Sequence, residues 1–407
     1  MNVLLLEPSF PDNQKQFARA LADVGATVIG IGERPEEHLD DDVKGWLTHY
    51  EQVGSVVDDG AVEQATRWAQ EHVWVDRLEA TVEAHVMTAA RVRERCGIPG
   101  TSVRTAHLCR DKPAMKEVLR RAGVRCARST GASTPDEVRA FADDVGFPLV
   151  IKPPDGAGAS GTHRVDDRGD LERAIADSGV AHGATVAVEE FVTGHEGFYD
   201  TITVNGDVLH DFACHYYPNV LEAMRTRWIS PQFVSTNRLD SAPAYAEVRE
   251  MGRRVIEALE IGTSATHMEW FAGDQGLVFS EIGCRPPGVR AWDLYAAGND
   301  LDIYREWAEA IVHGRRGRAA SRRLAAGIIA LRPEGDGTIS GYSGVDEIQE
   351  RFGELIMDAH LPPPGTATQG VEAGYMANAW IRACHEDYDH LRHVLDEIGR
   401  TVTVHSS

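Results

Sequence analysis

The first hundred residues alternate short apolar runs with an amphipathic segment. Residues 2–9 and 26–32 are apolar and rich in β-branched side chains, which predicts two strands. Between them, residues 14–24 place Phe17 and Leu21 on one face at helical spacing. A strand, a helix and a second strand in this order predict a parallel βαβ unit.

The first clear stop signal is Gly97-Ile98-Pro99-Gly100, which follows an expected helix over 82–96. Beyond it, helices mix with strands that pair locally, and Asn205-Gly206 is a strong hairpin turn. The expected helices are 111–121, 133–145, 244–259 and 386–399, and the expected strands are 147–152, 185–191, 199–204, 325–331 and 374–383.

Composition narrows the class of protein. The net charge of −22 opposes the phosphate backbone, so we expect no nucleic-acid partner. No apolar run approaches ~20 residues, so no membrane span is expected. The six cysteines are scattered, with no C-x-x-C pair, which favours reduced thiols and a cytoplasmic location.

A glycine-rich loop over 155–162 directly follows the strand that ends at Lys152. Small residues let backbone N–H groups approach phosphate oxygens, and a lysine is a compact charge suited to a phosphate in a narrow cleft. Lysine is rare in this chain, which has only five. The pattern predicts a phosphate site formed by Lys152 and the loop residues Gly156, Gly158, Ser160 and Gly161.

Two glutamates flank an expected hairpin turn at 272–276. If the hairpin closes symmetrically, Glu269 faces Phe279, and Glu281 lies diagonally across on the same face, about 7–8 Å away. Like charges at this distance repel unless a cation lies beside them, and magnesium prefers carboxylate oxygens. The spacing predicts a metal site at Glu269 and Glu281. His267, two residues earlier, is either a metal or substrate contact or a hydrogen-bonded structural histidine.

Four stretches occur in an order that resembles the ATP-grasp superfamily, in its carboxylate–amine (amino-acid or peptide) ligase form. They are Arg110-Asp111-Lys112, Lys152 with its glycine loop, Glu189-Glu190-Phe191-Val192 with Glu196, and Glu269 followed by Glu281 and Arg285. The resemblance implies an ATP-grasp fold, α/β and α+β in class. Its parts are an N-terminal βαβ domain (1–104), a lid subdomain (105–185), a central antiparallel sheet (186–313) and, after a linker, a C-terminal α+β piece (324–407).

The resemblance also implies which residues bind each part of the nucleotide. Lys112 and Lys152 would bind ATP on its α-phosphate side, and Glu190 and Val192 would meet the adenine edge. Glu196 would accept the ribose hydroxyls. Glu189 is treated as an ordinary acidic strand end and is left out of the site.

For the metal and the chemistry, the resemblance implies Mg²⁺ (or Mn²⁺) on Glu269 and Glu281, with Lys152 and Arg285 as catalytic residues. The superfamily pattern at this point is Glu-x-Asn-x-Arg. Here Gly283 stands in the place of the asparagine, which puts the coordination of a second metal ion in doubt.

The expected activity is ATP-dependent formation of an amide or peptide bond through an acyl phosphate, from a small-molecule carboxylate and an amine. Two alternatives stay open, a phosphotransferase acting on a small-molecule hydroxyl and a nucleotide-binding protein without turnover. A homodimer is left open as the quaternary state, and the sequence names neither substrate.

Overall fold

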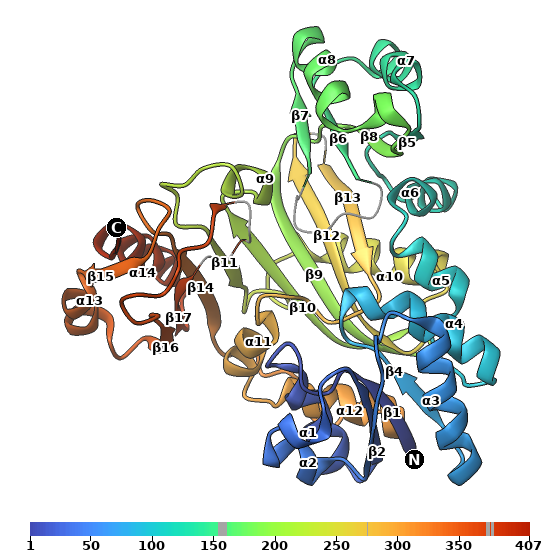
Figure 1. Ribbon diagram of the computed structural model, residues 1–407. Coiled ribbons are helices and arrows are strands. Elements are labelled where there is room, and N and C mark those ends of the chain that lie inside the picture. The colour runs from blue at the N-terminus through green and yellow to red at the C-terminus, as the bar shows by residue number, and fades with distance from the viewer. Residues whose placement is uncertain (154–160, 275, 372–374, 376–377) are drawn as a thin grey trace.

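The computed structural model describes residues 1–153, 161–274, 276–371, 375 and 378–407 (Figure 1). An N-terminal domain (blue) and a C-terminal part (orange to red) flank a large central sheet, and a small domain (green) projects beyond the sheet. Within the described residues, no helix has both the length and the apolar character needed to cross a membrane.

The N-terminal domain is built on a parallel sheet with strand order β3-β2-β1-β4. The expected strand–helix–strand unit is present, although the first strand ends at Leu6, before the turn that contains Pro8. The strands are β1 (Asn2–Leu6), β2 (Thr27–Gly32), β3 (His49–Gln52) and β4 (Arg77–Glu79); the helices are α1 (Gln14–Asp23), α2 (Asp41–Trp46), α3 (Asp59–His72) and α4 (Val86–Cys96). Two short 3-10 turns, η1 (Glu36–His38) and η2 (Glu83–His85), precede α2 and α4.

Two helices connect this domain to the rest of the chain, α5 (Val103–Leu108) and α6 (Lys112–Arg121). The side chain of Asp111 caps α6 by accepting a hydrogen bond from the backbone N–H of Ala114, at 2.9 Å. Because α6 begins at Lys112, Lys112 and Lys116 are one helical turn apart and lie on the same face.

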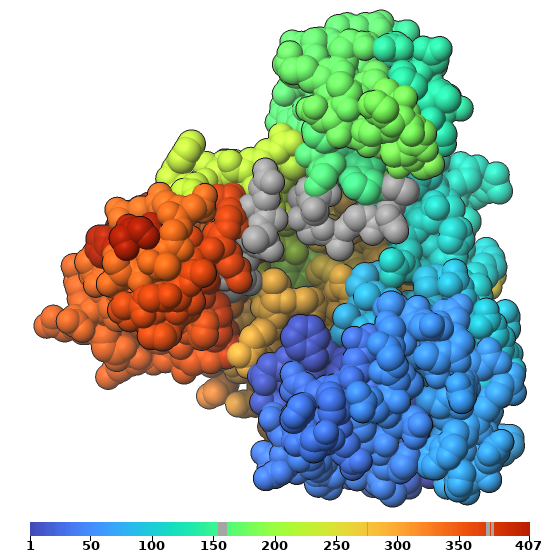
Figure 2. All heavy atoms as spheres, in the orientation of Figure 1, coloured from blue at the N-terminus to red at the C-terminus, as the bar shows by residue number. Residues whose placement is uncertain are grey.

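The small domain projects from the rest of the molecule (Figure 2). It contains an antiparallel sheet of order β5-β8-β6-β7, covered by two helices (Figure 1). Thr134 and Glu137 form a capping box at the start of α7, within the helix that the sequence predicts over 133–145. Its elements are β5 (Ser129–Ala132), α7 (Pro135–Val145), β6 (Leu149–Lys152), β7 (His163–Val165), α8 (Arg168–Asp177), the 3-10 turn η3 (Val180–His182) and β8 (Val186–Glu190).

The central sheet has eight strands in the order β13-β12-β9-β10-β11-β14-β17-β16, all paired antiparallel. Its strands are β9 (His195–Val204), β10 (Asp207–Tyr217), β11 (Gln232–Ser235), β12 (Ser264–Gly273), β13 (Gly276–Gly283), β14 (Ala325–Leu331), β16 (Ile356–His360) and β17 (Ala379–His385). The helices of this region are α9 (Val220–Ala223), α10 (Tyr245–Ala258), α11 (Ala291–Asn299) and α12 (Ile303–His313). The C-terminal part of the chain therefore completes one side of the central sheet with the strands β14, β17 and β16.

The remaining C-terminal elements are two helices and the two strands of a separate sheet, β15-β18. They are β15 (Ile339–Ser343), α13 (Val345–Phe352), α14 (Tyr388–Thr401) and β18 (Thr403–Ser406). The α/β and α+β fold predicted from the sequence is confirmed. The predicted domain limits stay predictions.

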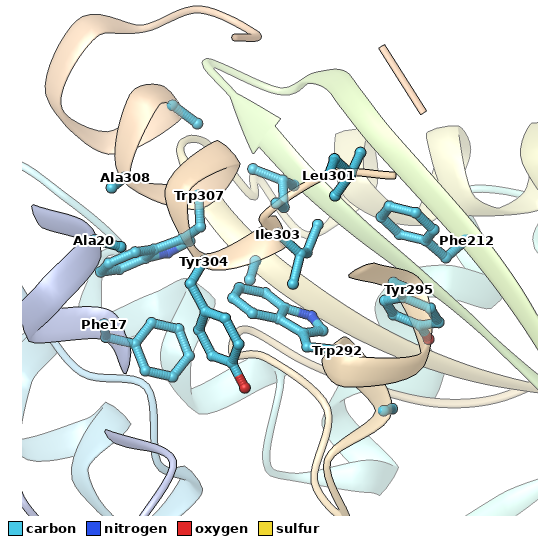
Figure 3. Packing of buried hydrophobic residues seen from close by; sticks show 14 of the residues in the cluster. Phe17, Ala20, Phe212, Trp292, Tyr295, Leu301, Ile303, Tyr304, Trp307 and Ala308 are labelled. Atoms are coloured by element: carbon cyan, nitrogen blue, oxygen red, sulfur yellow. The ribbon is translucent and has the colours of Figure 1, made fainter. Parts of the chain in front are cut away.

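A cluster of aromatic side chains joins the N-terminal domain to the central region (Figure 3). Phe17 of α1 contacts the rings of Trp292, Tyr304 and Trp307 of α11 and α12, with ring centroids 5.0–5.2 Å apart. Burying a large apolar side chain contributes about 1.5–3 kcal/mol. This cluster therefore holds the N-terminal domain in a defined position against α11 and α12.

Candidate active site

A cavity lies between the small domain and the central sheet, with walls from α6, β6, β8, α9, β12 and β13. Seven residues singled out from the sequence line it: Lys112, Lys152, Glu190, Val192, Glu196, Glu269 and Glu281. These residues lie far apart between Lys112 and Glu281 in the sequence, so the fold brings distant motifs to one place.

Two residues that sequence reasoning missed, Lys116 and Glu189, also line the cavity. Glu189 is 4% exposed, and its two carboxylate oxygens contact Lys116 Nζ at 2.9 Å and Lys152 Nζ at 2.7 Å. Lys116 is 1% exposed. The available signal for Lys116 is its position one turn after Lys112 in a chain with few lysines. Glu189, which the sequence analysis leaves out of the site, lies in the cavity wall between two lysines.

The charges of this buried group stabilise one another. Burial alone would raise the pKa of Glu189, but the ammonium groups of Lys116 and Lys152 lower it to about 2. Burial lowers the pKa of Lys116, whereas the carboxylates of Glu189 and Glu281 outweigh burial and raise the pKa of Lys152. The cavity wall therefore presents a fixed set of charges of both signs.

The strands that carry Glu269 and Glu281 pair in a different register from the one expected. Trp270, rather than Glu269, faces Phe279, and the register then shifts so that Glu269 lies directly opposite Glu281. The expected diagonal arrangement is therefore wrong, because the turn is tighter than assumed and the strand contains a bulge. Lys112 Nζ lies 3.2 Å from Glu281 Oε2 and, despite burial, helps to lower the pKa of Glu281.

His267 is part of a hydrogen-bonded chain behind the carboxylates. Its Nδ1 lies 2.7 Å from Asp200 Oδ1, and its Nε2 lies 3.6 Å from Glu269 Oε1. Tyr295 donates a hydrogen bond to the other oxygen of Asp200. Burial opposes the charged form, but Asp200 outweighs it and raises the pKa of His267 to about 9. The contacts match the structural alternative for this histidine and place it beside a predicted metal ligand.

The predicted adenine and ribose residues line the cavity next to the small domain. The backbone N–H of Glu190 donates to the carbonyl of Arg128 at 2.8 Å, and its carboxylate accepts from the N–H of Arg128 at 3.2 Å. Glu196 is buried and accepts a hydrogen bond from the N–H of Val220 at 2.6 Å. Burial and the carboxylate of Glu269 raise the pKa of Glu196 to about 8. The roles of Glu190, Val192 and Glu196 toward a nucleotide stay predictions.

Part of the predicted phosphate loop falls outside the described residues, namely Gly156, Gly158 and Ser160. Gly161 is described and has φ 65°, a left-handed conformation that favours glycine. Thr162 lines the cavity, and its carbonyl accepts a hydrogen bond from Arg225 Nη2 at 2.8 Å. The described end of the loop therefore borders the cavity.

Arg285 lies in a smaller cavity that shares Lys112 and Glu281 with the larger one. Its Nε lies 2.8 Å from Glu83 Oε2, and its Nη1 donates to the carbonyl of Pro286 at 2.8 Å. The larger cavity and the smaller one thus meet at the carboxylate of Glu281.

Glu269 and Glu281 fit a magnesium ion that takes its other ligands from substrate phosphate oxygens and water. In the described part of the chain, no three His, Cys, Asp or Glu side chains are grouped so as to hold a metal on their own. Mg²⁺ is commonly bound by one or two carboxylates together with phosphate oxygens and water. Glu269 and Glu281, opposed on one face of a hairpin and beside three lysines, match that requirement.

The fold and the lining residues define a protein with a charged cavity between a small domain and an antiparallel sheet. Residues 117–297 match the family model described as the ATP-grasp domain, the family that the sequence resembles. An L-arginine-specific L-amino acid ligase of Bacillus subtilis is 24% identical over 348 residues, which are 81% of this chain and 80% of that protein.

Two solved structures share the fold over nearly the whole chain. An L-amino acid ligase from Bacillus licheniformis has a TM-score of 0.78 at 16% identity, covering 100% of this chain and 98% of that chain. An N5-carboxyaminoimidazole synthetase from Staphylococcus aureus complexed with ADP has a TM-score of 0.71 at 13% identity, covering 98% and 96%. These likenesses confirm the predicted fold.

Proposed function

We propose that this protein is an ATP-dependent carboxylate–amine ligase that forms an amide or peptide bond and releases ADP and phosphate. One observation supports this most strongly: three lysines and two opposed carboxylates line the same cavity. The lysines are Lys112, Lys116 and Lys152, and the carboxylates are those of Glu269 and Glu281. The ligase class predicted from the sequence is also the class named for the relatives described above.

The proposed reaction has two steps. A carboxylate oxygen of the acid attacks the γ-phosphorus of ATP, the bond to the β–γ bridging oxygen breaks, and ADP leaves. The amine then attacks the carbonyl carbon of the acyl phosphate, and phosphate leaves while the amine loses a proton. Because a free carboxylate is too poor an electrophile for an amine, the acyl phosphate is required.

The residues of the cavity have distinct tasks in this scheme. Lys112 and Lys152 neutralise phosphate charge, and Arg285 neutralises charge on the transferring phosphoryl group from the adjoining cavity. Glu269 and Glu281 would hold Mg²⁺ or Mn²⁺, which supplies further charge neutralisation when bound. Closing of the small domain over the phosphates would keep water from the acyl phosphate.

For the substrates, we propose amino acids, on the basis of the L-arginine-specific L-amino acid ligase relative. We place the reaction in the cytoplasm, where ATP and reduced thiols occur together. The phosphotransferase alternative uses the same charges with a hydroxyl in place of the carboxylate. The opposed carboxylates and Arg285 disfavour the alternative without turnover.

A screen of ADP release tests the proposal. Purified protein is incubated with Mg-ATP and pairs drawn from the twenty standard amino acids, together with simple organic acids, amines and alcohols. We expect ADP and phosphate to appear only when an acid and an amine are both present, with an amide as product. ADP release with an alcohol and a phosphate ester as product would instead establish the phosphotransferase.

A further inference from the structure

Gly283 leaves an open position on the functional face of the metal hairpin. It lies directly opposite His267 in the β12–β13 ladder, two residues after Glu281. Because side chains alternate along a strand, a side chain at position 283 would point to the same face as Glu281 and Arg285. The bare backbone at this position therefore lies next to the carboxylate of Glu281 on that face.

A residue of the N-terminal domain fills that position. A Cβ atom added to Gly283 would lie 3.3 Å from Glu83 Oε2 and 3.7 Å from Arg285 Nε. Glu83 belongs to η2 and lies 202 positions before Arg285 in the sequence. The fold thus places a carboxylate from a distant domain where β13 has no side chain.

Glu83 is itself held in place on both sides. Arg285 Nε contacts Glu83 Oε2 at 2.8 Å, while Arg110 Nη1 donates to the backbone carbonyl of Glu83 at 2.7 Å. Glu83 and Arg285 are partly buried, with side chains 31% and 18% exposed. The aromatic cluster at Phe17 (Figure 3) fixes the domain from which Glu83 reaches β13.

We propose that Glu83 is a positioning residue that holds the guanidinium of Arg285 toward the γ-phosphate side of the site, through the space that Gly283 leaves open. The inference rests on the proposed function, because it assigns Arg285 to the phosphoryl group. A guanidinium on a long, flexible side chain loses less rotamer freedom on binding when a partner already fixes it. An ion pair this exposed contributes little to stability, so its effect belongs in phosphate binding rather than in folding.

The test compares two nucleotides that differ in the γ-phosphate. Calorimetry measures the Kd of Mg-ADP and of the non-hydrolysable Mg-AMPPNP for the wild type, Glu83→Ala, Arg285→Ala and the double variant. We expect each single change to weaken Mg-AMPPNP about tenfold and Mg-ADP less than twofold. The double variant should be no weaker than Arg285→Ala, because residues that act through one another are not additive.

Glu63→Ala is the matched control. Glu63 is a partly exposed glutamate of the same domain that also pairs with an arginine, Arg67, at 2.7 Å. It should change neither Kd. If Glu83→Ala also leaves the Kd of Mg-AMPPNP unchanged while Arg285→Ala raises it, the positioning role is wrong and the proposed function stands. If the wild type binds neither nucleotide, both the inference and the proposed function fail.

A second pair of variants tests the occupied space. Gly283→Asn should weaken Mg-AMPPNP because the new side chain competes with Glu83 for the same position. Combining Gly283→Asn with Glu83→Ala should bind Mg-AMPPNP about as weakly as Glu83→Ala alone, because both changes remove the same contact with Arg285. Equal affinity of Gly283→Asn and the wild type would contradict the proposed placement of Glu83.

Discussion

Glu269 and Glu281 are direct cross-strand neighbours because one residue, Ser280, is extra in the β13 strand. Nearer the turn, Trp270 faces Phe279, and beyond the shift Glu269 faces Glu281. Without the shift, Glu269 would face Ser280, and Glu281 would point to the opposite side of the sheet. The bulge is therefore what brings both carboxylates to the cavity.

The first prediction concerns this pair. Glu281→Gln keeps the shape of the side chain but removes one of the two opposed charges, so the protein should lose at least 10²-fold in ADP release, as losses of key transition-state charge stabilisation do. The loss should grow as Mg²⁺ becomes limiting. The measurement is the initial rate of ADP release against Mg²⁺ concentration, with thermal unfolding to check the fold.

Glu257→Gln, on the exposed face of α10, serves as the control for this change and should behave like the wild type. A Glu281→Gln protein with a normal rate at limiting Mg²⁺ would show that the hairpin is not the metal site.

The second prediction concerns Lys152, whose ammonium borders the phosphate loop. Lys152→Ala should weaken Mg-ATP binding at least tenfold, about 1.4 kcal/mol or more, because a buried cation facing the phosphates is lost. Calorimetry provides the measurement, and Lys44→Ala, which removes a lysine at the surface of α2, provides the control. Unchanged affinity in Lys152→Ala would remove this residue from the nucleotide site.

The third prediction concerns Glu189, which joins Lys116 and Lys152. Glu189→Gln leaves two buried ammonium groups without their carboxylate, which should destabilise the protein by about 3–5 kcal/mol at neutral pH. Chemical denaturation of the two proteins measures the difference in the free energy of unfolding. A difference below about 1 kcal/mol would contradict a stabilising role for the group.

The same pair of proteins gives a pH dependence with a defined sign. The pKa of Glu189 is about 2 in the folded protein and near the ordinary 4.5 when unfolded. Its contribution to stability is therefore fully present above about pH 5 and is lost as the pH falls through 4.5 toward 2. The stability difference between the wild type and Glu189→Gln should shrink over that window.

Local signals predicted much of the fold. The Gly97 stop and the Asn205-Gly206 turn each depend on neighbouring residues, and the structure has both. The site needed information that local patterns do not contain. Whether Glu189 or Glu190 faces the lysines depends on how α6 packs against β8.

Neither the bulge at Ser280 nor the contact between Glu83 and Arg285 could be predicted from the sequence, for related reasons. A bulge changes the register without changing the hydrophobic pattern enough to be detected. Glu83 reaches Arg285 only because the N-terminal domain is fixed against α11 and α12. Both features arise from tertiary packing.

The most direct test of the proposed ligase is to trap its intermediate. The protein is incubated with ATP, Mg²⁺ and the acid identified by the ADP-release screen, with hydroxylamine in place of the amine. We expect a hydroxamate of the acid in an amount equal to the ADP formed, and adding the amine should divert this product to the amide. ADP formed together with a stable phosphate ester, and no hydroxamate, would contradict the acyl-phosphate mechanism.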